Sequence, residues 1–244
     1  MKLIHVAAVV VIAAGIAASM PAGIAGQGAP TPDQMVAALK TNLAESQKRL
    51  RQYEWVETTA ISLKGEEKSR KQSRVYYGAD GKLTKLPIGG AAPPQAAPAG
   101  RGGRGGRLKE KVVENKKDEM QDYMERAVNL IQMYVPPSPE QIQKAKDAGN
   151  MRLQPPQQGK VRVEFPNFVQ PSDLLAVDVD GKALLLTAIS VATYLDKPED
   201  AVTLGVRFGT LTDGTSYTAQ TTLDAKAKNI RVVVENAGHR PLAR

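Results

Sequence analysis

The chain has 244 residues, with 33 Lys and Arg against 25 Asp and Glu, a formal net charge of +8, two His and no Cys. Without Cys there is no disulfide, no thiolate metal site, no cysteine nucleophile and no lipid-modified cysteine. His5 lies in an N-terminal apolar run, so a Ser-His-Asp triad, a histidine zinc site or a histidine general base would have to use His239. We therefore expect a protein that is not an enzyme and that uses no metal and no cofactor.

The first 25 residues have the three-part pattern of a secretory signal peptide. Lys2 supplies the positive start, residues 3–18 form an apolar core, and the small residues Gly23 and Ala25 fit positions −3 and −1 of a cleavage site. An uncleaved membrane anchor is the alternative, although the core is shorter than the roughly 20 residues that span a bilayer. We expect cleavage near Ala25 and an exported protein, in the periplasm or outside the cell. A bacterial envelope protein fits the lack of Cys.

The next segment predicts a long amphipathic helix over residues 32–52. Thr31 fits the N-cap position and Pro32 the first helical position. Apolar residues then recur at three-, four- and seven-residue spacing, which places them on one face. They are Val36, Leu39, Leu43, Leu50 and Tyr53. We expect this face to pack against a sheet.

Three strands are predicted after the helix, over residues 53–63, 68–77 and 82–88. The first is rich in aromatic and β-branched residues, which favour extended structure. Asp80-Gly81 precedes the third strand and is a strong hairpin signal, because a tight turn needs positive φ.

Residues 87–107 have a different composition. They hold eleven of the 37 Gly and Pro in the chain and only one apolar side chain larger than Ala. Such a segment cannot form a core. We therefore expect a disordered Gly/Pro/Arg-rich insertion at residues 89–107 within a single domain that spans residues 26–244.

The middle of the chain predicts two helices, over residues 108–135 and 138–149. The first has an apolar stripe at helical spacing and ends before Pro136-Pro137, which breaks a helix. The second can start at Ser138-Pro139-Glu140 and end at Gly149. The stripe consists of Met120, Met124, Ala127, Ile131 and Tyr134.

The rest of the chain predicts six further strands, joined in part by the Asp-Gly turns at 180–181 and 213–214. They cover about 161–165, 174–179, 182–195, 202–209, 217–224 and 230–234. About nine strands in consecutive hairpins predict an antiparallel meander rather than a doubly wound sheet. The expected fold class is α+β, with a curved antiparallel sheet, or incomplete β-barrel, packed on the N-terminal helix and on mid-chain lid helices.

This order of elements resembles the LolA-like superfamily, which includes the periplasmic lipoprotein carrier, its outer-membrane receptor and the regulator RseB. The matching features are the exported start, the helix that runs directly into Tyr53-Glu54-Trp55-Val56, the hairpin after it, the mid-chain helices and the returning meander. The resemblance is one of architecture, and the Gly/Arg-rich insertion departs from it. It implies a half-barrel whose apolar concave face, covered by a lid, holds acyl chains. Residues 193–217 also resemble exported bacterial proteins of uncharacterised function.

Eight residues are our candidates for the hydrophobic lining of such a cavity. They are Trp55, Ile61, Leu63, Met120, Met124, Ile131, Phe208 and Tyr217. Plain core packing is the competing interpretation, because methionine and aromatic residues at such spacing also fill cores. The cavity interpretation predicts a lipid or a lipoprotein as the partner.

The positive charge is concentrated in residues 31–107, with 14 Lys and Arg against 7 Asp and Glu, while residues 160–236 have 8 against 10. An envelope scaffold or adhesion protein that contacts anionic surface polymer through residues 64–107 is therefore the alternative function. A charged edge strand and a solvated loop are the competing interpretations. Nucleic acid is disfavoured, because the Arg-Gly-Gly repeat has no interleaved aromatic residue and the chain starts as an exported one. The candidate anion contacts are Lys68, Arg70, Arg74, Arg101, Arg104 and Arg107.

Acidic residues predict neither a metal site nor a catalytic pair. Residues 178–181 resemble part of a calcium loop, but its positions 1 and 12 would be Ala176 and Thr187, which supply no carboxylate. Glu54 and Glu57 would lie on opposite faces of a strand.

Overall fold

The computed structural model describes residues 32–89 and 104–242, so the predicted signal peptide and residues 90–103 of the predicted insertion lie outside it. Its helices are α1 (Pro32–Leu50), α2 (Arg104–Gln132) and α3 (Pro139–Asp147), with a 3-10 turn at Lys226–Lys228. Its strands are β1 (Tyr53–Leu63), β2 (Glu66–Tyr77), β3 (Leu83–Ile88), β4 (Arg152–Leu153), β5 (Lys160–Pro166), β6 (Leu174–Asp180), β7 (Leu186–Tyr194), β8 (Ala201–Thr210), β9 (Ser216–Ala225) and β10 (Ile230–Pro241).

The described strands form one antiparallel sheet in the order β3-β2-β1-β10-β9-β8-β7-β6-β5-β4. Neighbours in the sheet are neighbours in sequence except β1 and β10, which pair from Tyr53 with Pro241 to Leu63 with Ile230. The outer strands β3 and β4 do not pair with each other, so the sheet is open. The α+β fold with a curved, open antiparallel sheet is confirmed.

The number of strands and several element boundaries differ from the sequence prediction. The described residues form ten strands rather than about nine, because the two residues of β4 pair with β5. Two residues are too short for the alternation that marks a strand. α2 begins at Arg104, so the end of the insertion predicted at 89–107 has helical backbone.

The three Asp-Gly turns behave in two ways. Gly81 and Gly214 adopt positive φ, at 74° and 81°, as tight turns require. At Asp180 the turn is wider, because its carboxylate accepts the backbone N–H groups of the two residues at 182 and 183, at 2.9 and 2.7 Å. Leu184 then takes the positive φ, and β7 starts at Leu186 instead of at the predicted residue 182.

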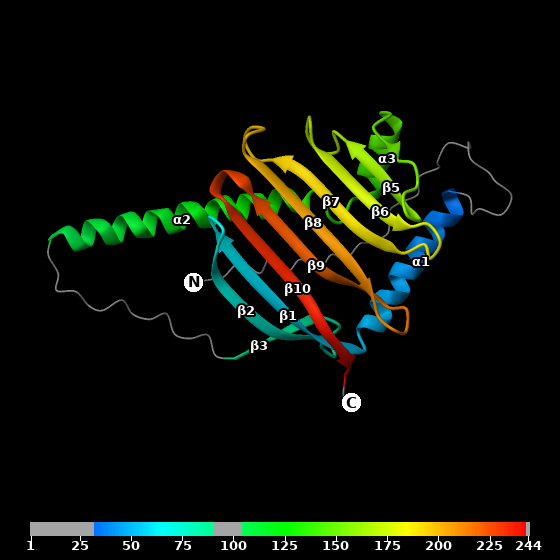
Figure 1. Cartoon of the computed structure of the whole chain (residues 1–244), viewed down its shortest axis with the longest axis horizontal. Helices are drawn as coiled ribbons and strands as arrows, with labels where there is room; N and C mark the ends of the chain where they lie inside the picture. Colours follow the sequence, from blue (N-terminus) through cyan, green and yellow to red (C-terminus); the bar gives the residue numbers. More distant parts are fainter. Residues whose placement is uncertain (1–31, 90–103, 243–244) are drawn as a thin grey trace.

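The three helices lie on one face of the sheet, which we call the inner face (Figure 1). α1 runs beside the ends of β8 and β9, and α2 crosses the strands and projects past the sheet edge near β1 and β2. A single hydrophobic core lies between the helices and the inner face. No helix in the described part of the chain is long and apolar enough to cross a membrane. The largest fully buried side chains of the core are Tyr134, Ile142, Phe165, Leu175 and Ile189.

Candidate functional site

A cavity of about 460 Å³ lies between the inner face of the sheet and helices α1 and α2. Its wall comes from α1, α2, β1, the β2–β3 hairpin and β8–β10, and of the described elements β4–β7 and α3 contribute none of it. Small-molecule sites in proteins span about 300–1,000 Å³. This cavity is therefore the candidate functional site.

Most of the cavity wall is aliphatic. Side chains alternate between the two faces of a strand, so every second residue of β8 and of β10 points into the cavity. α2 supplies the facing wall with residues three apart, which share one side of a helix. These residues are Leu204 and Val206 on β8, Val232 and Val234 on β10, and Val128 and Ile131 on α2.

A cluster of four rings, which we call the aromatic cluster, completes the wall. Trp55 stacks on His239 with ring centroids 5.5 Å apart and planes 17° apart. Tyr217 lies 4.1 Å from His239, and Tyr77 lies 6.1 Å from Trp55. Trp55 is oriented by its indole N–H, which donates to Asn236 Oδ1 at 2.9 Å. The cluster offers ring faces and edges to an apolar ligand.

Two backbone features bring His239 and Tyr217 into the aromatic cluster. Between its pairs with Glu54 and Val56, β10 carries one residue more than β1, and Gly238 in this bulge has a φ of 66°. On β8, Gly209 pairs with Tyr217 and leaves room for its side chain, because a Cβ at 209 would lie only 2.8–2.9 Å from atoms of the Tyr217 side chain. Both features depend on glycine.

β9 and β10 separate before they reach the aromatic cluster, in a region that we call the fork. Their ladder runs only as far as the pair of Gln220 with Glu235. Beyond it β10 pairs with β1 alone and β9 pairs with β8 alone. Asn236 bridges the fork, because its Nδ2 donates to the carbonyl of Thr218 at 2.9 Å. Tyr217 and His239 of the cluster therefore lie where β9 and β10 are no longer paired with each other.

His239 is uncharged at neutral pH. Burial lowers its pKa to about 4, since the charged imidazolium is poorly solvated there. Its ring neighbours are Trp55 and Tyr217. A histidine that acts as a general base is usually oriented by a carboxylate, so this setting favours packing and hydrogen bonding over proton transfer.

Four charged side chains line the cavity where it meets the surface, and we call them the mouth: Arg51, Glu57, Lys82 and Lys85. Lys85 Nζ donates to both carboxylate oxygens of Glu57 at 2.7 Å, and these side chains are 19% and 12% exposed. Arg51 and Lys82 are exposed, and the Arg51 guanidinium lies 5.9 Å from the centre of the Tyr77 ring. The site thus combines an aliphatic interior with a charged rim.

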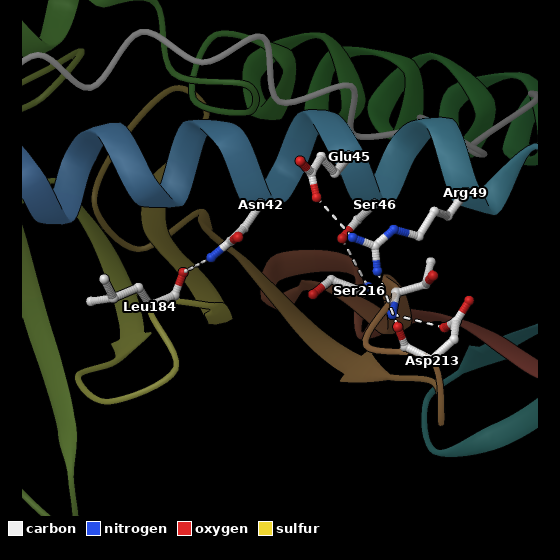
Figure 2. Close-up of polar contacts among 8 residues, drawn as sticks. Asn42, Glu45, Ser46, Arg49, Leu184, Asp213 and Ser216 are labelled. Carbon is white, nitrogen blue, oxygen red and sulfur yellow. Dashed lines mark hydrogen bonds and ion pairs between the residues drawn. The ribbon is translucent and has the colours of Figure 1, made fainter.

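α1 is held over the cavity by polar contacts that Figure 2 shows. Ser46 Oγ accepts the backbone N–H of Ser216 at 3.0 Å, and Arg49 donates to the carbonyl of Asp213 at 3.0 Å. Tyr53 donates its hydroxyl to the Asp213 carboxylate at 2.8 Å. These contacts tie the last turns of α1 to the turn between β8 and β9, and so fix one wall of the site.

A buried carboxylate fixes the junction of α2 and α3. Asp173 accepts the backbone N–H groups of residues 168–170 at 2.5 to 2.9 Å and also accepts the hydroxyl of Tyr134. That hydroxyl lies 2.7 Å from Thr193 Oγ1. Burial and the nearby carboxylate raise the pKa of Tyr134, so the hydroxyl remains a donor. α3 then begins directly after Ser138, as the sequence predicts, and Ser138 and Gln141 form a capping box.

The structure divides the eight residues predicted to line the cavity into two groups. Those in the cavity wall are Trp55, Ile131, Phe208 and Tyr217. Of the other four, Met124 belongs to the hydrophobic core, and Ile61, Leu63 and Met120 are partly buried and pack against it. Leu63 lies eight residues along β1 from Trp55, roughly 26 Å of extended strand. Alternation alone fixes the face of a residue but not its position along the strand, and ligand contact stays a prediction for all eight.

Sequence reasoning missed His239, Arg51 and Lys85. Strict alternation along β10 from Asn236 would place Gly238 on the cavity side. The bulge shifts the alternation by one residue, so His239 faces the cavity instead. The signal that could have found it is the glycine itself, because glycine within a strand often marks a bulge. Arg51 and Lys85 meet only through the pairing of β1, β2 and β3, which no local pattern specifies.

The described cations of the predicted anion-binding stripe have carboxylate neighbours in this chain. The pairs are Lys68 with Glu66, Arg70 with Glu67 and Arg74 with Glu54. Arg240 also contacts the buried Glu54, while Glu57 lines the mouth, so the two glutamates lie on opposite faces of β1 as predicted. Arg101 lies outside the described residues, and Arg104 and Arg107 lie in the first turn of α2. Within residues 32–89 and 104–242, no three His, Asp or Glu side chains come close enough to hold a metal ion.

No family model matches the chain, and no curated protein matches it either. Solved structures similar to it include a LolA superfamily protein from Nitrosomonas europaea, with 8% sequence identity, a TM-score of 0.34, and coverage of 85% of this chain and 93% of that one. A DUF1329 family protein from Desulfovibrio piger is similar at 13% identity, with a TM-score of 0.32 and coverage of 84% and 93%. At these TM-scores the likenesses carry no part of the functional argument, which rests on the cavity.

Proposed function

We propose that this protein is a non-enzymatic, exported envelope protein that holds a hydrophobic or acylated ligand, a lipid or a lipoprotein, in its cavity. The observation that carries the proposal is the lined space itself, about 460 Å³ between the aliphatic residues of β8 and β10 and those of α2. Apolar surface moved from water into such a space contributes about 25 cal/mol per Å². The aromatic cluster adds ring surface to the same wall.

Export and the lack of enzymatic activity are parts of the same proposal. Residues 1–25 carry the signal-peptide pattern. His239 packs among aromatic rings, and Glu57 is neutralised by Lys85. Neither side chain has the setting of a general acid or base.

A matched pair of substitutions on β9 tests the proposed ligand site. Thr221 lines the cavity between its cross-strand partners Val206 and Val234, and Thr222 is the next residue and lies on the outer face. Thr221→Phe fills the cavity, so we expect affinity for a fluorescent fatty acid to fall at least tenfold. Thr222→Phe adds the same ring outside and leaves affinity unchanged. Fluorescence titration measures both, and thermal melts show that both variants fold.

Two outcomes would contradict the proposal. One is a wild-type protein that takes up no fatty acid and that, when purified from membranes, releases no lipid on organic extraction and native mass spectrometry. The other is equal affinity in wild type and Thr221→Phe. The scaffold alternative has less support, because the carboxylate partners of Lys68, Arg70 and Arg74 offset the charge on which docking would depend.

A further inference from the structure

The mouth carries more positive than negative charge. Its single carboxylate, Glu57, is bound through both oxygens by Lys85. Arg51 and Lys82 remain, and neither forms an ion pair with a carboxylate in the described ranges 32–89 and 104–242. Asp80 stands two residues from Lys82 and accepts the Lys82 backbone N–H at 3.0 Å. The rim therefore presents two cationic side chains without an ion-pair partner of their own.

These two cations come from different parts of the chain and meet at one place. Arg51 directly follows α1, and Lys82 lies between β2 and β3. The Arg51 guanidinium lies over Tyr77, the last residue of β2. A Cβ at Gly81 would lie 3.9 Å from Arg51 Nη1, so the guanidinium also lies beside the turn that carries Lys82. Both side chains line the cavity.

The interior next to this rim is a poor place for a charge. Most of its wall is aliphatic or aromatic, and His239 is kept neutral by burial. A charged group without a partner in such surroundings would lose its hydration without compensation. A ligand that carries a charge would therefore leave the charged group at the mouth and place only its apolar part inside.

We propose that the ligand is an amphiphile with an anionic headgroup, a carboxylate or a phosphate, which binds Arg51 and Lys82 while the aliphatic chain fills the cavity. This inference rests on the proposed function and narrows its ligand class. Guanidinium groups bind carboxylate and phosphate through paired N–H donors, and a lysine ammonium adds a point charge. The orientation follows from the site, with the headgroup in water and the chain between sheet and α2.

Three ligands with the same alkyl chain test the proposal: hexadecanoate, hexadecyl phosphate and hexadecanol. Each is titrated, as competitor of a fluorescent fatty acid, against wild type and against the double variant Arg51→Gln/Lys82→Gln. We expect wild type to bind the two anions about tenfold or more tightly than the alcohol. The double variant should lose that preference and keep its affinity for the alcohol. Salt should weaken only the anions, because it screens exposed charges.

Two further variants distinguish the loss of charge at the mouth from general effects of substitution on net charge and folding. Lys64→Gln/Lys144→Gln removes the same charge from exposed residues that do not line the cavity, and it should bind all three ligands as wild type does. Arg51→Lys/Lys82→Arg keeps the charge and should keep the preference for anions. Equal binding of hexadecanoate and hexadecanol by wild type would overturn the inference of an anionic headgroup but would not contradict the proposed function. If none of the three binds, the proposed function fails as well.

Discussion

The space over the inner face of the sheet is filled in one half of the sheet and open in the other. In the closed half, β4–β7 with α3, Phe165, Leu175 and Ile189 are at most 2% exposed and fill the space beneath the helices. In the open half, β1–β3 with β8–β10, the cavity lies under α1 and α2. There Thr221 takes a wall position and Gly209 makes room for a ring. The open half therefore keeps a space beneath the helices where the closed half is filled.

Polar anchoring differs in the same way. The closed half is fastened by Asp173, whose carboxylate binds residues 168–170 and Tyr134 out of reach of water. The open half has contacts at its exposed rim as well as buried ones, and at the rim Arg49 and Tyr53 bind the exposed Asp213. A buried polar network is costly to disturb, while exposed contacts can break and re-form. We therefore expect the closed half to stay rigid beside the site, while the rim contacts of the open half can break and re-form when a ligand enters.

Removal of the buried carboxylate should produce the largest effect on stability. Asp173→Ala leaves several buried N–H groups and the Tyr134 hydroxyl without their acceptor. We expect a loss of about 3–4 kcal/mol in the free energy of unfolding, measured by urea denaturation. Asp173→Asn keeps the volume and one acceptor oxygen, and should lose less. A loss below about 1 kcal/mol for Asp173→Ala would show that the closed half is not held there.

The neutral histidine of the open half should give a smaller, pH-dependent effect. The pKa of His239 is about 4 in the folded protein and ordinary, near 6.5, in the unfolded chain. Between those values the unfolded chain binds more protons, so stability falls as pH drops from 6.5 to 4. His239→Phe keeps a ring and should remove about 1–2 kcal/mol of this fall, after allowance for partial exposure. Urea midpoints of wild type and His239→Phe are compared at pH 7 and pH 4.5, so the contribution of the carboxylates, which both proteins share, cancels. Identical pH profiles of the two proteins would contradict the prediction.

The smallest expected effect on stability concerns Gly209. Gly209→Ala would place a Cβ against the Tyr217 side chain, which must move, and we expect a cost of about 1 kcal/mol or less. The displaced ring would disturb the stack on His239 and shift the fluorescence of Trp55, the single tryptophan. The control is Gly205→Ala on the same strand, because nothing lies within 4 Å of its Cβ position. An emission spectrum altered equally by both variants would contradict the role of Gly209.

The sequence predicted most of the fold and only part of the site. Local signals sufficed where the determinant is local: the start of α3, strand alternation, the Asp-Gly turns at Gly81 and Gly214, and the Pro pair after α2. They failed at Asp180, where a side chain widens a turn, and at His239, where a bulge reverses alternation. Local signals could not show that Arg51 and Lys82 line the same cavity, because the pairing of distant strands determines this. They also could not show that Trp55 lies at the cavity and Leu63 away from it, because this depends on the position along one strand.

The pairing of β1 with β10 has a consequence for how this protein reaches its native state. Trp55 and Asn236, bonded across these strands, are 181 residues apart in sequence. Contacts of such separation form slowly, because a long loop must close first. A chain that emerges N-terminus first therefore has β1 exposed as an edge for most of its synthesis, and such edges invite pairing with other chains. Under the proposed export this delay is useful, since a chain that cannot complete its sheet early remains unfolded for translocation.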